Sequence, residues 1–164
     1  MFLMVLGSLV AVFAPGCYEE VVYMDLPVEF TDTVSDDEWI GEKEMILGVY
    51  EEQLFRSLND DDPVHIINGL QGGTWVHLSI RISGMPRVGT VKVTLGEDIG
   101  DIEYRLKLVR TAEGFLEAYD IPVPVPLEGD ELEALYGQTV WLKVSFTSEE
   151  HFVGAENQVV LEKG

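Results

Sequence analysis

Two histidines flank a glycine-rich segment, and their spacing fits a small binding site. His65 precedes and His77 follows Asn68-Gly69-Leu70-Gln71-Gly72-Gly73. Asn and Gly tolerate positive φ, so this segment can reverse the chain and place the two imidazoles on opposite arms of a β-hairpin. We include Gln71 of the loop among the candidate residues. One hypothesis is a metal or small-ligand site at this hairpin. The alternative is that both histidines are polar members of a strand face or hydrogen-bond the loop.

The sequence patterns of several common catalytic and ligand-binding sites are missing. No G-x-S-x-G nucleophile elbow occurs, and the segment 69–74 lacks the lysine of a phosphate-binding loop. Blue copper needs a cysteine with two histidines, and the single cysteine, Cys17, has another expected use. The run Asp60-Asp61-Asp62 lacks the EF-hand spacing, so we expect a solvated turn there rather than a calcium site. We therefore predict a non-enzymatic protein, with no catalytic residue, no assigned metal ligand and no cofactor.

A strictly alternating stretch begins at Thr74 and positions one of these histidines. Val76, Leu78, Ile80 and Ile82 share one face; Trp75, His77, Ser79 and Arg81 share the other. A period of two is typical of a strand with one buried face. The outward register of a later alternating segment contains Trp141.

If these two strands are neighbours, Trp75, His77, Arg81 and Trp141 form an aromatic and basic patch suited to a protein, peptide or sugar partner. Two alternatives stay open. The acidic segment near the front of the chain could cover the patch and pair with Arg81. The residues could also be ordinary surface.

The rest of the chain consists of further short strand patterns. They cover residues 45–50, 64–67, 91–95, 102–108, 115–119, 140–147 and 151–162. Residues 129–136 predict one short helix, with Asp130 as a possible cap and Gly137 after its end. Many short strands with turns every ten or so residues indicate an all-β domain. The segments 139–147 and 158–162 resemble the last two strands of an immunoglobulin-like domain. The resemblance implies an immunoglobulin-like antiparallel β-sandwich with one short helix.

Prolines occupy alternate positions in Ile121-Pro122-Val123-Pro124-Val125-Pro126-Leu127. The intervening apolar residues can still face a core. Because proline has no N–H, the segment cannot pair with neighbours on both sides. We predict an extended edge segment; a proline-rich motif for a partner is the alternative.

Charge is abundant and unevenly distributed. The 164 residues contain 30 Asp and Glu against 10 Lys and Arg, a formal net charge of −20. This charge repels phosphate backbones, which argues against nucleic-acid binding. Fifteen acidic residues fall between Glu19 and Asp62, with only Lys43 and Arg56 as bases. The front of the chain is therefore expected to be an acidic arm before the β domain.

The first fourteen residues are uncharged, and Ala14-Pro15-Gly16-Cys17 follows. This apolar run is too short for a stable membrane anchor but has the length of a signal-peptide core. The segment resembles a bacterial lipoprotein signal, in which the cysteine is acylated and becomes the new N-terminus. The Gly69-Leu70-Gln71-Gly72-Gly73 block with a histidine before it also resembles blocks in uncharacterised exported bacterial proteins, which bring no known activity.

These observations predict a signal peptide over 1–16, an acidic tether over 17–43 and a β-sandwich domain over 44–164. The resemblance implies that acylated Cys17 holds the protein in a lipid bilayer of the cell envelope, at the outer membrane, the periplasmic face or the cell surface. The main functional prediction is a non-enzymatic binding or scaffolding protein with a protein or glycan partner. The alternative is the metal or small-ligand domain at His65 and His77.

Overall fold

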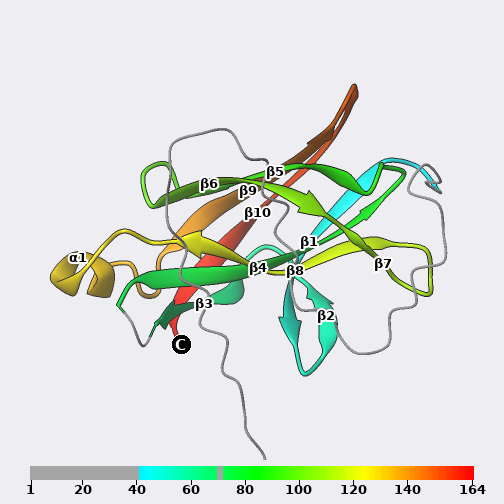
Figure 1. The fold of residues 1–164 in the computed structure, drawn as a ribbon. Coiled ribbons are helices and arrows are strands. Elements are labelled where there is room, and N and C mark those ends of the chain that lie inside the picture. The colour runs from blue at the N-terminus through cyan, green and yellow to red at the C-terminus, as the bar shows by residue number, and fades with distance from the viewer. Residues whose placement is uncertain (1–40, 70–71) are drawn as a thin grey trace, which may run out of the picture.

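Ten strands and one short helix make up residues 41–69 and 72–164, the part of the chain that this computed structural model describes (Figure 1). The elements are β1 (Glu44–Glu51), β2 (Leu54–Ser57), β3 (Asp62–Asn68), β4 (Thr74–Ser83), β5 (Val88–Leu95), β6 (Gly100–Lys107), β7 (Val109–Arg110), β8 (Leu116–Pro124), α1 (Gly129–Glu133), β9 (Thr139–Ser148) and β10 (His151–Lys163). The predicted signal peptide, most of the predicted tether, Cys17 and Gln71 lie outside the described residues. Among the described residues no helix has the length and apolar character needed to cross a membrane.

The hairpin predicted around the glycine-rich segment is confirmed. β3 and β4 pair antiparallel, with Ile66 opposite Val76 and Asn68 opposite Thr74. The alternation in β4 is confirmed at seven of its eight positions, because the four aliphatic residues are fully buried while Trp75, His77 and Arg81 keep part of their surface exposed. Ser79, predicted to face outward, is fully buried, since the register with β8 shifts beside it and its hydroxyl oxygen accepts from the N–H of Asp120. The same pattern holds in β5 and β9, whose apolar residues enter one continuous core.

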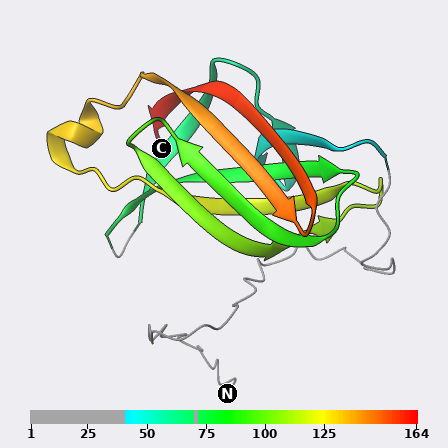
Figure 2. The same ribbon diagram turned by 90° about the horizontal axis from the view of Figure 1, so that it is seen from above.

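The described strands form one mixed sheet. Its order is β2-β1-β4-β3-β10-β9-β5-β6, and β8 pairs with the other edge of β4. All the pairs are antiparallel except β3 with β10, which run parallel. The sheet curls into a half-barrel, so that β5, β9 and β10 lie across the core from β4 and β8 (Figure 2).

The alternate prolines explain why the curl stops short of a closed ring. The N–H of Val125 donates to the carbonyl oxygen of Thr74 at 2.8 Å, and Val123 and Ile121 share its register toward β4. The backbone at Pro122 and Pro124 therefore points toward β6, and neither residue has an N–H to donate. The hydroxyl of Tyr104 instead donates to the carbonyl oxygen of Pro122 at 3.4 Å. The predicted edge segment is confirmed, and its prolines keep β6 and β8 from joining in a ladder.

A β-bulge in β8 decides which side chains enter the core. The register with β4 shifts between Leu78 and Ile80, and Asp120 has a φ of +50°. Before the bulge Ala118 is buried, and after it Ile121 is buried three residues later rather than two. A bulge adds one residue to one strand, so the alternation changes phase there.

The prediction of an all-β domain with one short helix is confirmed at this level. An immunoglobulin-like sandwich consists of two antiparallel sheets, whereas these strands form a single curled sheet with a parallel pair. The helix is shorter than expected and ends at Glu133. Asp130 lies in its first turn instead of capping it, because Glu128 is the cap residue.

Candidate functional site

The predicted aromatic and basic patch does not form. Trp75, His77 and Arg81 lie on β4, but β3 and β10 separate β4 from β9, which carries Trp141. Because the sheet curls, the outward faces of β4 and β9 lie on opposite sides of the core. The patch prediction assumed neighbouring strands, and the crossover topology makes that assumption wrong.

Arg81, on the outer surface of β4, makes an ion pair with β8 and contacts two aromatic rings. Its Nε donates to a carboxylate oxygen of Glu117 on β8 at 2.5 Å. Its guanidinium carbon lies 4.5 Å from the ring centroid of Phe55 and 4.9 Å from that of Phe115. The Glu117 side chain is only 3% exposed. The guanidinium therefore already has a counter-charge and two aromatic neighbours within the fold.

The other oxygen of Glu117 accepts a hydrogen bond from the hydroxyl of Tyr119, two residues along β8. The ring of Tyr119 packs against that of Tyr50, with centroids 4.5 Å apart. Burial and then the hydrogen bond to the Glu117 carboxylate raise the pKa of Tyr119 above its ordinary value of 10.0. The phenol therefore stays protonated and keeps donating to the buried carboxylate.

We expect this raised pKa to make folding sensitive to alkali. Above pH 10 Tyr119 ionises in the unfolded chain but stays neutral in the fold, so its contribution to stability is full below that pH and declines above it. Tyr119→Phe lowers stability at neutral pH by about 1.5–3 kcal/mol, the range for a hydrogen bond to a charged group. The difference from wild type then narrows above pH 10 by at most about 1.4 kcal/mol per pH unit. Urea unfolding from about pH 8 to 11 measures this difference, and a constant difference would contradict the argument.

Trp75 closes the glycine-rich hairpin loop. A Cβ at Gly69 or at Gly73 would collide with its indole, so the ring lies directly over both glycines. The hydroxyl of Thr74 also donates to the side-chain oxygen of Asn68 at 3.2 Å. The indole is therefore used to cover the loop, and Gln71, which lies within it, is outside the described residues.

The two candidate histidines have different neighbours. The β3–β4 ladder includes only residues 66–68 of β3, and its register extended by one residue sets His65 toward His77. On the other edge of β3, His65 lies opposite Glu162 of β10. The Nδ1 of His77 lies 3.9 Å from a carboxylate oxygen of Asp120 on β8. Within the described ranges, no three or more His, Cys, Asp or Glu side chains come together as a group that could hold a metal ion. Ligand binding at these histidines stays a prediction.

The acidic turn before β3 uses its carboxylates within the fold. An Asp62 oxygen accepts from the backbone N–H of Asn59 at 2.8 Å, and this bond lowers the pKa of Asp62. An Asp60 oxygen accepts from the backbone N–H of Gln158 on β10 at 2.9 Å. The Asp62 side chain therefore fixes the turn itself, and the Asp60 side chain holds the turn against β10.

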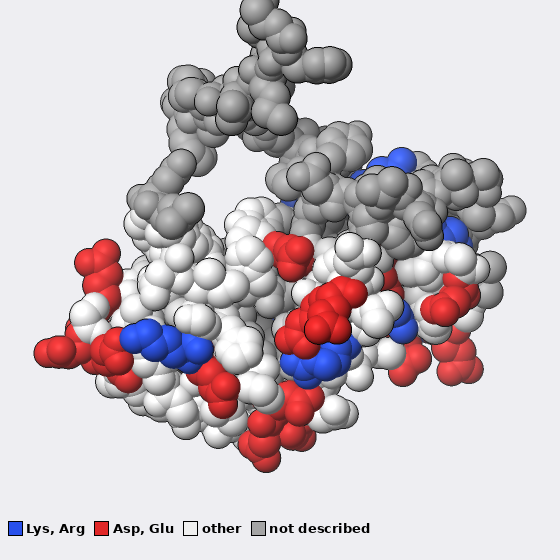
Figure 3. Space-filling view, turned by 90° about the horizontal axis from the view of Figure 1, so that it is seen from below, with Lys and Arg blue, Asp and Glu red and all other residues white. Residues whose placement is uncertain are grey.

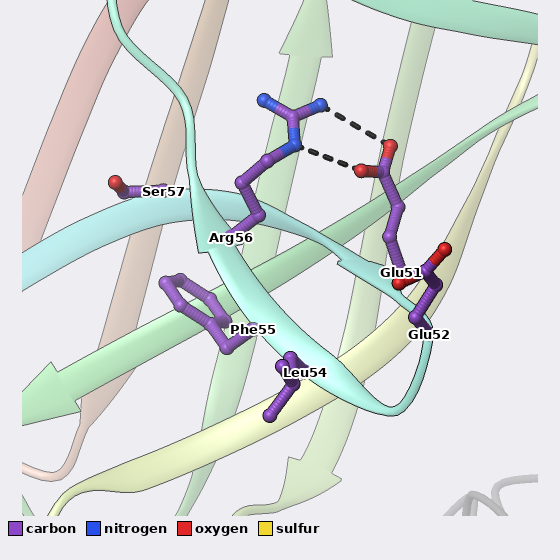
Figure 4. A pocket seen from close by; sticks show the side chains of 6 residues that line it. All are labelled: Glu51, Glu52, Leu54, Phe55, Arg56 and Ser57. Atoms are coloured by element: carbon purple, nitrogen blue, oxygen red, sulfur yellow. Dashed lines mark hydrogen bonds and ion pairs between the residues drawn. The ribbon is translucent and has the colours of Figure 1, made fainter.

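The β1–β2 hairpin borders one surface hollow, of about 920 Å³ (Figure 4). Its lining comes from this hairpin alone: Glu51, Glu52, Leu54, Phe55, Arg56 and Ser57. Arg56 and Glu51 form a two-point ion pair of 2.8 and 3.2 Å, which neutralises both charges. Leu54 is 71% exposed, and Phe55 leans over Gly48 toward Arg81. The hollow presents one isolated aliphatic side chain.

A second hollow, of about 450 Å³, is built from several elements around Trp141. Its lining comes from β5, the β5–β6 turn and β9: Thr94, Gly96, Glu97, Ile99, Val140, Trp141 and Lys143. The indole is 44% exposed, and the Lys143 ammonium lies 5.8 Å from its ring centroid. The hollow thus combines an accessible aromatic ring with both hydrogen-bonding and aliphatic side chains.

The turn that forms one wall of this hollow depends on a glycine. Gly96 has a φ of +63°, and its N–H donates to the carbonyl oxygen of Trp141 at 2.8 Å. A Cβ there would lie 2.7 Å from the Cδ1 of Ile99. The turn is therefore fixed against the backbone of Trp141 itself, which gives the hollow a defined shape.

Trp141 belongs to a larger outward surface, which we call the Trp141 face. It is the outward side of β5, β9 and β10, with Lys92, Thr94, Trp141, Lys143, Ser145, Thr147, Phe152, Glu156 and Gln158. Phe152 is 62% exposed. The strip combines hydroxyl, amide and charged side chains with two accessible aromatic rings.

Charges on the Trp141 face neutralise one another. Lys143 pairs with Glu156 at 3.6 Å, and Lys92 lies 3.9 Å from a carboxylate oxygen of Asp101 on β6. The surface seen from below, by contrast, has more acidic than basic area among its coloured atoms (Figure 3). In a chain with a net charge of −20, the Trp141 face is a locally balanced area.

Compared with known proteins, the chain matches no family model, no curated protein and no solved structure.

Two features of this structure, the buried Glu117 and the β-bulge in β8, were not predicted from the sequence. The buried Glu117 is an acid inside an apolar stretch, F-L-E-A-Y, which signals a satisfied internal charge. The bulge is visible as a change in apolar phase between Ala118 and Ile121. The adjacency of β9 to β5 and β10 has no comparable local signal.

Proposed function

We propose that this chain is a non-enzymatic, lipid-anchored protein of the cell envelope that binds a partner through the Trp141 face. The exposed indole of Trp141 beside a formed hollow is the observation that carries the binding role. Accessible tryptophan is enriched where proteins bind partners, because it offers a large rigid surface and one hydrogen-bond donor. Two other candidate residues already have contacts within the fold, since Arg81 pairs with Glu117 and Trp75 packs over Gly69 and Gly73. This leaves Trp141 as the better candidate for contact with a partner.

The anchor rests on the sequence: an uncharged apolar run followed by the only cysteine, Cys17. Two acyl chains on one sulfur-bearing terminus give stable membrane attachment, where a single chain gives marginal attachment. The immunoglobulin-like relationship is part of the same proposal. It rests on the β9–β10 hairpin and on two facing layers, and the parallel β3–β10 pair departs from it.

The anchor and the face are tested in cells that process bacterial lipoproteins. The full chain should incorporate labelled palmitate and sediment with membranes, and Cys17→Ser should lose both properties. A photoreactive phenylalanine analogue in place of Ser145 should give crosslinked adducts that Trp141→Ala reduces. The same analogue in place of Glu113, in the β7–β8 turn, is the control. Unlabelled, soluble wild type would overturn the anchor, and equal adducts at both positions would overturn the binding face.

A further inference from the structure

The arrangement of the two exposed aromatic rings narrows the class of partner. Trp141 and Phe152 share the outward side of the β9–β10 hairpin, where Phe152 lies opposite Thr147. The ring of Phe152 lies along β10 over Gly154, because a Cβ there would be 3.5 Å from its Cζ. Gly154 is opposite Ser145, four residues from Trp141 on β9. At roughly 3.3 Å per residue, positions 141 and 145 are about 13 Å apart along the strand, so the Phe152 ring lies about that far from the position that carries the indole.

The surface between these rings is polar. Lys143 and Glu156 lie opposite each other in the middle, with Thr94 and Gln158 on the adjoining positions. Gly154 adds no side chain, so nothing interrupts the surface beneath Phe152. Hydroxyl, amide, ammonium and carboxylate groups can donate to and accept from a ligand that carries many hydroxyls.

We propose that the Trp141 face binds a neutral, extended chain of β-linked hexopyranose rings. A pyranose ring has apolar C–H faces, which stack on an indole or a phenyl ring, and hydroxyls at its rim, which bond to side chains between the two platforms. The hollow beside Trp141 has the mixed aliphatic and polar lining of a small-ligand site and receives one ring. The two platforms lie at separate places along the β9–β10 hairpin, so a ligand that reaches both must be an extended chain of several rings.

Other partner classes fit this surface less well. A protein interface of standard size buries about 800 Å² per partner around a core depleted of charge. Here an ion pair lies between the two aromatic rings, so they do not form such a core. Nucleic acids and acidic polysaccharides need a net positive surface, and the lysines of this face are matched by carboxylates. A neutral polyhydroxylated ligand requires neither property.

This inference rests on the proposed function, and its test separates the two. The full chain in mild detergent is titrated with cellohexaose, chitohexaose and mannohexaose, and binding is followed by tryptophan fluorescence and calorimetry. We expect at least one of these β-linked chains to bind, and Trp141→Ala to weaken that binding at least tenfold. Trp75→Phe, on the opposite side of the core, should leave the affinity unchanged. Phe152→Ala should weaken the hexasaccharide but not the corresponding disaccharide.

Thermal unfolding of Trp141→Ala is measured beside the binding, because the indole is 44% exposed and its loss can cost some stability. A loss of binding in a variant that is still folded at the temperature of the titration does not come from misfolding. The inference is overturned if none of the three saccharides binds, or if binding survives in Trp141→Ala. If position 145 gives protein adducts but no saccharide binds, the saccharide inference is wrong and the proposed binding face still stands. If there are no adducts at position 145 and no saccharide binds, the proposed binding face is wrong as well.

Discussion

Arg81→Met is expected to lower the free energy of unfolding by about 3–5 kcal/mol, because it leaves a buried carboxylate without its counter-charge. Glu117 is 3% exposed, and its partners in the fold are Arg81 and the hydroxyl of Tyr119. The methionine keeps much of the aliphatic packing between Phe55 and Phe115 but loses the charge and the cation–π contacts. Urea unfolding at neutral pH measures the loss.

Two further variants separate charge burial from packing. Arg56→Met removes an ion pair to Glu51 whose side chains are both well exposed, so its cost should stay below about 1 kcal/mol. Combining Arg81→Met with Glu117→Leu removes both buried charges and should recover most of the lost stability. A double variant as unstable as the sum of its single variants would show that the pair does not act through its buried charge.

Phe146→Ala is expected to cost about 3–5 kcal/mol, the range for emptying a buried aromatic site. The ring is fully buried near the hairpin end of β9, opposite Val91 of β5 and Val153 of β10. It also fills the space over Gly89, where a Cβ would lie 2.6 Å from its Cζ. Neighbouring strands paired on both sides of β9 limit how far the cavity can collapse.

Phe152→Ala on the same hairpin is the matched control. That phenylalanine is 62% exposed, so its removal should change stability by no more than about 0.5 kcal/mol. Thermal or urea unfolding of the two variants side by side gives the comparison. Similar losses in both would mean that β9 and β10 do not pack as described.

The two stability predictions concern two different parts of the sheet, and only one of them lies behind the candidate site. Phe146 lies on the inner side of β9, directly behind the surface that carries Trp141 and Lys143. Arg81 lies on the outer side of β4, a strand that lies across the core from β9. The loss of Phe146 should therefore disturb the Trp141 face, while the loss of Arg81 should affect it only through global unfolding.

The sequence by itself determined the class of fold and the inward and outward sides of its main strands. A period of two is a local property, so the buried aliphatic residues of β4 and the outward position of Trp141 follow from neighbouring residues alone. The edge position of the proline segment was predictable for the same reason. A missing N–H is a property of the residue, whatever strand lies beside it.

Only the tertiary structure decided which strands lie side by side, because pairing joins residues far apart in the chain. The parallel β3–β10 pair and the position of β9 between β5 and β10 separate Trp141 from Trp75, His77 and Arg81. Arg81, Trp75 and Trp141 all face outward in the sequence pattern, but the structure gives them different contacts and different accessibility. Arg81 faces a buried carboxylate and two rings, Trp75 covers a loop, and Trp141 is left accessible beside a hollow. Burial and accessibility arise from the packing of distant segments, which no local pattern contains.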